Sequence, residues 1–206
     1  MAAPVTPLNP KSFLCVAAHP DDMEFGAAGT VAKFVAGGAK GYYLILTDAS
    51  KGTADRTIEP KQLTALRQEE QRAAAGILGL EKVFFGDYED GALEVTQDVK
   101  RDIVRAIREV KPEVVITMDP SFIYSAEYGF INHPDHRAAG QATLDAVYPL
   151  ARDHLSFPEL LKEGLEPHKT ATVLLTNFEK HGFLVDITDH METKLKALGA
   201  HASQLP

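Results

Sequence analysis

The sequence predicts an α/β fold, a Rossmann-like three-layer α/β/α sandwich with a mostly parallel sheet, in one domain spanning residues 1–206. Short apolar runs rich in β-forming residues alternate along the chain with longer segments of helical periodicity, and strands separated by helices favour parallel pairing with right-handed crossovers. A chain of 206 residues can bury one sizeable core. No linker, internal repeat or low-complexity tract divides it, so we expect a single domain.

The first half of the chain begins with an apolar strand, Phe13–Val16. The helix that follows ends at Gly37-Gly38, a typical C-cap pair. Gly79 ends the second helix in the same way, and the polar, Gly- and Pro-containing stretches between elements indicate loops. We therefore expect strands at 13–16, 41–47 and 82–85, helices at 23–36 and 61–78, and loops at 48–60 and 86–94.

The second half continues the alternation. Thr96 is a plausible N-cap, Pro112 blocks continuation of the helix that Thr96 starts, and Pro134 suits the first turn of the next helix. Three prolines and one glycine interrupt residues 149–170, so no single regular element is expected there. We predict helices at 96–110, 138–147 and 188–198, strands at 113–118, 170–176 and 183–187, and a long loop at 119–132.

Composition narrows the function classes. Lys and Arg total 21 against 29 Asp and Glu, a formal charge of -8, which argues against nucleic acid as a partner. No apolar stretch approaches the roughly 20 residues of a membrane span, and no apolar block of signal-peptide length opens the chain. The single cysteine, Cys15, lies inside an apolar strand and is expected to be a buried packing residue. We expect a soluble, cytoplasmic protein with a small-molecule partner.

Charged residues follow the first strand directly, in the order His19-Pro20-Asp21-Asp22. An open α/β sheet binds its ligand beyond the carboxyl ends of its strands, so this is the expected place for a site. Carboxylates beside an apolar strand lose hydration, and a metal ion or another cation is their natural partner.

A second cluster, His133, Asp135 and His136, follows the loop after the strand at 113–118. Two such clusters at strand ends exceed what one buried structural histidine would explain. A set of His, Asp and His ligands with an open fourth position is how catalytic zinc is held. Such a metal activates water and polarises a carbonyl, which predicts hydrolysis of an amide or ester, with a carboxylate left off the metal as base.

The segments AHPDDMEFG at 18–26 and HPDHRAAG at 133–140 resemble the two signature motifs of the zinc-dependent N-acetylglucosaminyl deacetylase family, also called LmbE-like or PIG-L. Weaker blocks, among them TDASKGT at 47–53 and AHASQ at 200–204, follow in the family's order. The resemblance implies an N-deacetylase acting on an N-acetylglucosamine-type sugar or conjugate. It implies Zn²⁺ as cofactor, with Fe²⁺ or another divalent metal as an option, and a homo-oligomer as a further option.

The same resemblance implies a role for each site residue. His19, Asp22 and His136 would be metal ligands, and Asp21 the general base. His133 would be the acid that protonates the leaving amine, and Asp135 would orient that acid, a task that also follows from the usual pairing of site imidazoles with carboxylates. Arg67 and Asp90 would bind substrate.

Simpler interpretations compete for the last two residues. Arg67 with Glu70 or Gln71 could be an exposed helical pair, and Asp90-Gly91 could be only a turn dipeptide. His201 matches the AHASQ block, but its neighbourhood in the sequence assigns it no chemical task. The chain ends at Pro206, shortly after this block, and we expect a pocket that is open or closed by a neighbouring subunit.

Two other functions fit parts of the pattern. The two histidines and one carboxylate could form the facial triad of a non-haem iron oxygenase, although a free neighbouring aspartate has no obvious task there. A Rossmann-like nucleotide-binding module would need a glycine-rich phosphate turn after the first strand, where the chain has His-Pro-Asp-Asp instead.

Overall fold

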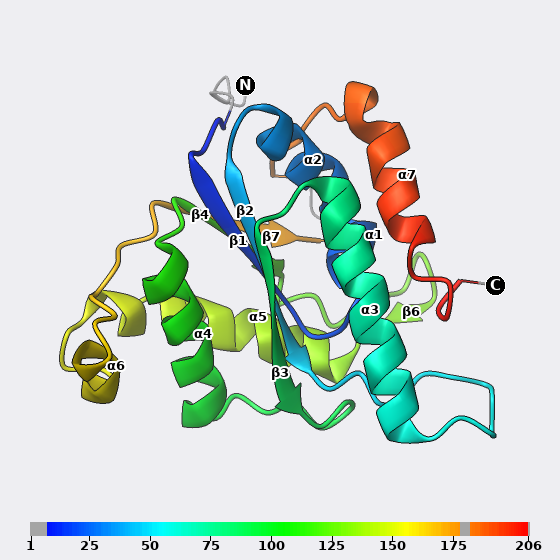
Figure 1. The fold of residues 1–206 in the computed structure, drawn as a ribbon, viewed down its shortest axis with the longest axis horizontal. Coiled ribbons are helices and arrows are strands. Elements are labelled where there is room, and N and C mark those ends of the chain that lie inside the picture. Colours follow the sequence, from blue (N-terminus) through cyan, green and yellow to red (C-terminus); the bar gives the residue numbers. More distant parts are fainter. Residues whose placement is uncertain (1–7, 178–181, 206) are drawn as a thin grey trace.

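The computed structural model describes residues 8–177 and 182–205, which form a central parallel sheet covered by helices on both faces (Figure 1). The five strands lie in the order β3-β2-β1-β4-β7, and every neighbouring pair is parallel. Their bounds are β1 Ser12–Ala17, β2 Lys40–Thr47, β3 Lys82–Tyr88, β4 Val114–Met118 and β7 Thr172–Thr176. This confirms the predicted three-layer α/β/α fold.

The helices form the two outer layers. Figure 1 shows α1, α2, α3 and α7 on one side of the sheet, and α4 and α5 on the other, with α6 beyond α4. Their bounds are α1 Asp22–Gly26, α2 Ala28–Ala36, α3 Pro60–Leu78, α4 Gln97–Val110, α5 Pro134–Val147, α6 Pro158–Lys162 and α7 Met191–Gly199. The short 3-10 helices span Leu150–Arg152 and Thr188–His190, and the hairpin strands are β5 Tyr124–Ser125 and β6 Phe130–Ile131.

Strand β1 lies at the centre of the sheet and is apolar on both faces. Phe13 and Cys15 join the core under α2, α3 and α7, whereas Leu14 and Val16 join the core under α4 and α5. All four side chains are fully buried, as expected for a parallel strand covered by helices on both sides. The predicted burial of Cys15 is therefore confirmed, and the polar residues after β1 stand at the edge of a rigid layer.

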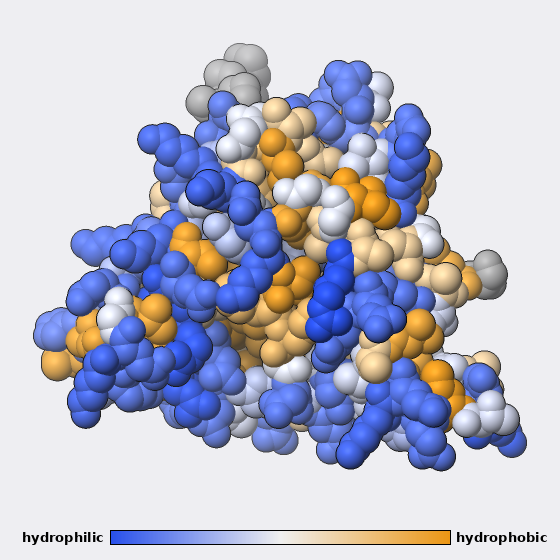
Figure 2. All heavy atoms as spheres, in the orientation of Figure 1, coloured by the Kyte–Doolittle hydropathy of each residue, from blue (hydrophilic) through white to orange (hydrophobic). Residues whose placement is uncertain are grey.

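The exposed edge strand β3 is protected by cations. Figure 2 shows apolar side chains gathered over this edge, between the more hydrophilic surfaces of α4 and α3. The Lys82 ammonium lies 4.0 Å from the centre of the Phe84 ring, and the Arg72 guanidinium lies 4.7 Å from the centre of the Phe85 ring. Charged groups over aromatic faces are favourable and discourage pairing of an edge strand with another chain.

Several predicted boundaries differ from the structure. The strand predicted at 183–187 is wrong: this segment has no regular structure and packs on α2, where Ile187 fills the space above Gly29 and the Asp186 carbonyl accepts a hydrogen bond from Lys33. The helix predicted at 23–36 is broken at Ala27, whose φ of -136° lies outside the helical range. Within the described residues, no helix is long and apolar enough to cross a membrane.

Candidate metal centre and active site

Seven of the eight predicted site residues, which come from different elements, line one cavity of about 490 Å³ at the carboxyl end of the sheet. The HPDD turn after β1 supplies three of them, α3 supplies Arg67, the loop after β3 supplies Asp90, and the start of α5 supplies the two histidines. The residues are His19, Asp21, Asp22, Arg67, Asp90, His133 and His136. Asp135 lies directly behind them and is buried.

The HPDD turn is held by its own second aspartate. One carboxylate oxygen of Asp22 accepts hydrogen bonds from the backbone amides of Ala18 and His19, at 3.1 and 2.8 Å. Asp21 adopts the left-handed conformation, with φ 84° and ψ -25°, which is uncommon for a residue with a side chain. The turn thereby sends consecutive side chains in different directions.

The ring nitrogens of two histidines converge on Asp22. His136 Nε2 lies 3.0 Å from Asp22 Oδ1, and His19 Nδ1 lies 3.7 Å from Asp22 Oδ2. The opposite nitrogens have other partners: His19 Nε2 lies 3.2 Å from both Asp135 and Asp90, and His136 Nδ1 lies 3.0 Å from the Asn132 side-chain oxygen. Metal-binding histidines commonly use one nitrogen for the metal and give the other to such an acceptor.

This arrangement fits a divalent metal. Two imidazoles and a carboxylate are the donors that zinc and similar ions take, and a ring nitrogen of each histidine lies 3.7 or 3.0 Å from the Asp22 carboxylate. Ligand atoms that all lie within 4.8 Å of one another come from His19, His133 and His136, and from His19, Asp90, His133 and Asp135. The residues described thus include a His/Asp cluster that could hold a metal.

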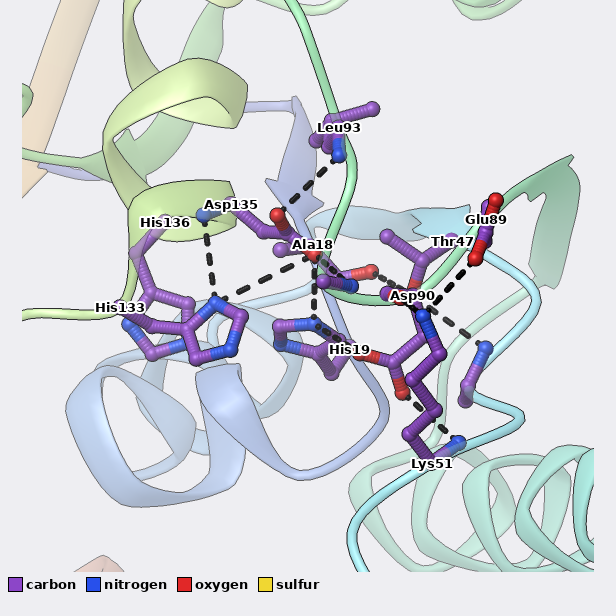
Figure 3. Close-up of polar contacts among 12 residues, drawn as sticks. Ala18, His19, Thr47, Lys51, Glu89, Asp90, Leu93, His133, Asp135 and His136 are labelled. Atoms are coloured by element: carbon purple, nitrogen blue, oxygen red, sulfur yellow. Dashed lines mark hydrogen bonds and ion pairs between the residues drawn. The ribbon is translucent and has the colours of Figure 1, made fainter.

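Asp135 connects both clusters to the loop after β3 (Figure 3). Its carboxylate accepts hydrogen bonds from the backbone amides of Gly91 and Leu93, at 2.7 and 3.1 Å, and contacts His19 Nε2. Its own backbone amide donates to His133 Nδ1 at 3.2 Å, while its carboxylate is 4.0 Å from that nitrogen. Asp135 therefore touches His133 chiefly through the backbone and His19 through the side chain.

Burial and neighbouring charges shift the pKa values of these groups. Burial, reinforced by the charge of Asp22, raises the pKa of Asp21 to about 6, although Arg67 opposes this. Burial lowers the pKa of His19, but hydrogen bonds to Asp135 and Asp90 outweigh it and raise that pKa to about 10. Burial and the nearby charge of His19 lower the pKa of His133. The carboxylates around His19 therefore favour the protonated form of its ring.

Arg67 is buried, which rules out the exposed helical pair. Its guanidinium donates to the carbonyls of Lys51 and Pro20, at 3.1 and 3.2 Å, and lies 3.8 Å from carboxylate oxygens of Asp21 and Asp90. Asp90 precedes Gly91, whose φ of 80° marks the turn expected from this dipeptide, and its carboxylate also faces the cavity. The turn and the site interpretations of Asp90 are thus compatible.

Sequence reasoning missed several residues of the site. The cavity is also lined by Phe25, Lys51, Gly52, Gly91, Met118, Phe130 and Gln204. Beneath the HPDD turn lie three fully buried polar residues, Glu24, Gln71 and His201. Glu24 belongs to the AHPDDMEFG motif and His201 to the AHASQ block, but neither motif assigns the side chain a task, because the contacts of all three residues join distant segments.

A second cavity, of about 540 Å³, lies beside β7. Among the described residues, its walls are mainly aliphatic side chains of β7 and of the segment 182–187, with no histidine. None of the eight predicted site residues lines this second cavity.

The fold and the cluster together define a Rossmann-like α/β protein with a metal-competent His/Asp site at the carboxyl end of its parallel sheet. The chain belongs to the PIG-L family, the GlcNAc-PI de-N-acetylases, whose model matches residues 14–147. This confirms the family resemblance carried by the HPDD and HPDH motifs.

Individual relatives agree with this membership. The chain is 37% identical to the diacetylchitobiose deacetylase of Thermococcus kodakarensis, over 95% of this chain and 71% of the relative. It is 28% identical to a probable N-acetyl-α-D-glucosaminyl L-malate deacetylase 2 of Bacillus anthracis, over 95% of this chain and 82% of the relative. The comparisons support neither the iron oxygenase nor the nucleotide-binding alternative.

Solved structures show the same architecture. The N,N'-diacetylchitobiose deacetylase of Pyrococcus horikoshii superimposes with a TM-score of 0.87 at 33% identity, covering 96% of this chain and 72% of that one. The 4-carboxy-2-hydroxymuconate hydratase GalB of Pseudomonas putida reaches 0.79 at 23% identity, covering 94% and 80%. The latter likeness concerns the fold alone, so the reaction has to be argued from the site.

Proposed function

We propose that this protein is a metal-dependent hydrolase that removes an acetyl group from an N-acetylated substrate, an N-acetylglucosamine-type sugar or sugar conjugate. The observation that carries the proposal is the convergence of His19, Asp22 and His136, with Asp21 and His133 in the same cavity. Membership of the PIG-L family and the names of the relatives support this choice of reaction and substrate class.

His19 Nδ1, His136 Nε2 and the Asp22 carboxylate would hold the metal, which we propose to be Zn²⁺, with Fe²⁺ or another divalent ion as the alternative. When bound, such an ion lowers the pKa of water and polarises a carbonyl oxygen. Asp135 would hold the His19 ring with Nδ1 toward the metal, because the Asp135 carboxylate accepts a hydrogen bond from Nε2, the opposite ring nitrogen.

Asp21 and His133 would move the protons. Asp21 borders the cavity, and Asp22, not Asp21, is the aspartate that lies against the ring nitrogens of His19 and His136. The Asp21 carboxylate is therefore available to accept a proton from the attacking water. His133 would donate a proton to the nitrogen of the leaving amine as the C–N bond breaks. The products are acetate and a free amine.

Substrate recognition would come from the remaining walls of the cavity. Arg67 and Asp90 are proposed to contact sugar oxygens, since a guanidinium donates and a carboxylate accepts hydrogen bonds. Phe25 and Phe130 line the same cavity and are 47% and 43% exposed, which offers apolar faces to a sugar ring. We also propose that the partner is a small molecule, that the protein is cytoplasmic and that it forms a homo-oligomer.

Metal analysis and an acetate-release assay test the proposal together. Purified protein should contain about one divalent metal per chain and release acetate from N-acetylated sugars or their conjugates. Asp22→Ala should lose metal, whereas Asp21→Asn should retain metal and lose turnover. Protein without stoichiometric metal, or an Asp21→Asn variant with full amide hydrolysis, would contradict the proposal. Oxygen uptake with Fe²⁺ and a 2-oxo acid would instead favour the oxygenase.

A further inference from the structure

One peptide unit of the HPDD turn is held from both ends by side chains of α3. The carbonyl of Pro20 accepts a hydrogen bond from Arg67 Nη2, and the amide of Asp21, in the same peptide unit, donates to Gln71 Oε1, each at 3.2 Å. Arg67 and Gln71 are four residues apart, so they project from the same face of the helix. Both side chains are buried, at 5% and 0% exposure.

The clamped peptide precedes a strained residue. Asp21 has φ 84°, where a side chain crowds the backbone, and such conformations persist only when surrounding contacts enforce them. Rotation of the Pro20–Asp21 peptide is the simplest way to relax this residue, because it changes φ of Asp21 directly. Hydrogen bonds to both the carbonyl and the amide oppose that rotation.

Gln71 is itself fixed from behind. Its Nε2 donates to Glu24 Oε1 at 3.1 Å, and the other oxygen of Glu24 lies 3.4 Å from His201 Nε2. Glu24 and His201 are fully buried, and neither Glu24 Oε2 nor a ring nitrogen of His201 has a hydrogen-bond partner among the described residues. The segment that carries His201 is tied to α3, because Ser203 donates two hydrogen bonds to Glu70.

The contact with Glu24 also fixes which way the Gln71 amide points. The NH₂ group of Gln71 donates to Glu24 Oε1, which leaves the amide oxygen to accept from the Asp21 backbone. The order from the protein interior to the turn is His201, Glu24, Gln71 and the Asp21 amide. Three segments far apart in the sequence contribute to it, because Asp21 and Glu24 lie three residues apart.

We propose that Gln71 is a positioning residue for Asp21, and that Glu24 and His201 act through Gln71 to hold the turn in its active conformation. This rests on the proposed function insofar as Asp21 is the base. Gln71 does not line the cavity, so it would act on the reaction only through the orientation of the Asp21 carboxylate.

Three variants test the clamp. Gln71→Met keeps the side-chain volume but removes both hydrogen bonds. The exchange Gln71→Glu with Glu24→Gln reverses donor and acceptor between the two side chains, while the residue at 71 still accepts from the Asp21 amide. Gln68→Met is the matched control, because Gln68 lies on the same helix and does not line the cavity.

We expect Gln71→Met to lower kcat by roughly tenfold to a hundredfold, with KM and bound metal little changed, because small displacements of a catalytic group have effects of this size. The double exchange should restore kcat to within about threefold of the original enzyme, and Gln68→Met should leave it unchanged, as expected for a contact that fixes geometry alone. Loss of thermal stability without a change in kcat would show that Gln71 is merely structural and would overturn the proposal.

Hydrogen exchange of the Asp21 amide, followed by NMR on the metal-loaded protein, separates this proposal from the proposed function. Hydrogen exchange of this amide should be slow in the original chain and in the double variant Gln71→Glu with Glu24→Gln, and at least about tenfold faster in Gln71→Met. This holds even if no substrate releases acetate, in which case only the proposed function fails. Two results would refute the clamp. One is an unchanged hydrogen-exchange rate of the Asp21 amide in Gln71→Met, and the other is a folded double variant, Gln71→Glu with Glu24→Gln, that is as impaired as Gln71→Met.

Discussion

Gly140→Ala tests the packing that places α5, the helix that carries His136. Gly140 is buried in the middle of this helix, one turn after His136. A Cβ atom there would lie 2.2 Å from the Met118 carbonyl oxygen at the end of β4. Because that obstacle is backbone in the central sheet, the helix has to move away by about 1 Å to reach ordinary contact distance.

The expected cost follows from two opposing terms. Inserting a methyl group into a packed interior costs about 1–3 kcal/mol, whereas replacing glycine by alanine within a helix gains about 0.5–1 kcal/mol. Because the obstacle at Gly140 is backbone, the upper part of the cost, about 2–3 kcal/mol, applies. The free energy of unfolding should therefore fall by about 1–2.5 kcal/mol, which lowers the Tm by roughly 2–10 °C for a chain of this size. His136 moves with the helix, so metal affinity should fall as well.

Gly76→Ala is the matched control. Gly76 lies in α3, is exposed, and would have nothing within 4 Å of an added Cβ. The same substitution should raise the free energy of unfolding there by about 0.5 kcal/mol or more. Urea denaturation of both variants in the presence of a chelator measures stability apart from metal binding. Changes of the same sign at the two positions would refute the packing argument for α5.

Three further predictions follow from buried groups. Removing metal with a chelator should lower the Tm by several degrees, because an ion that binds only the folded chain stabilises it and this contribution is lost; an unchanged Tm would count against a metal at this site. Burial raises the pKa of the Cys15 thiol well above its ordinary value, so Cys15 should stay protonated and fail to react with a thiol reagent at pH 8 until the protein unfolds. Arg108 is buried and donates to the carbonyls of Leu150, Ala151, Asp153 and Ser156, so Arg108→Met should cost at least about 3 kcal/mol and make residues 149–157 sensitive to protease, which limited proteolysis would detect.

The sequence was most informative where one segment determines its own structure. Apolar strands and glycine-terminated helices identified the three layers, and the HPDD and HPDH motifs marked two strand ends that the parallel sheet then brought together. Residues 183–187 were predicted wrongly because an apolar run of β-forming residues looks alike whether it pairs in a sheet or packs on a helix. The contact that decided it, Ile187 on Gly29, joins segments more than 150 residues apart.

The sequence predicted the candidate metal ligands better than it predicted the residues that contact them and hold the HPDD turn. Asp135 was expected to serve His133, yet its carboxylate lies nearest to His19, a partner that only the folded chain reveals. Likewise, periodicity alone could not show whether Arg67 faces water or the HPDD turn. Glu24 and Gln71 carry ordinary helical residue types, and their contact depends on how α1 packs on α3.

The left-handed backbone at Asp21 sets stability and turnover against each other at one position. Glycine is the residue that this conformation favours, and Asp21→Gly should relieve part of a strain of about 1–3 kcal/mol. If Asp21 is the base, the same change abolishes the reaction. Under that condition glycine at position 21 favours the stability of the chain, whereas aspartate favours turnover.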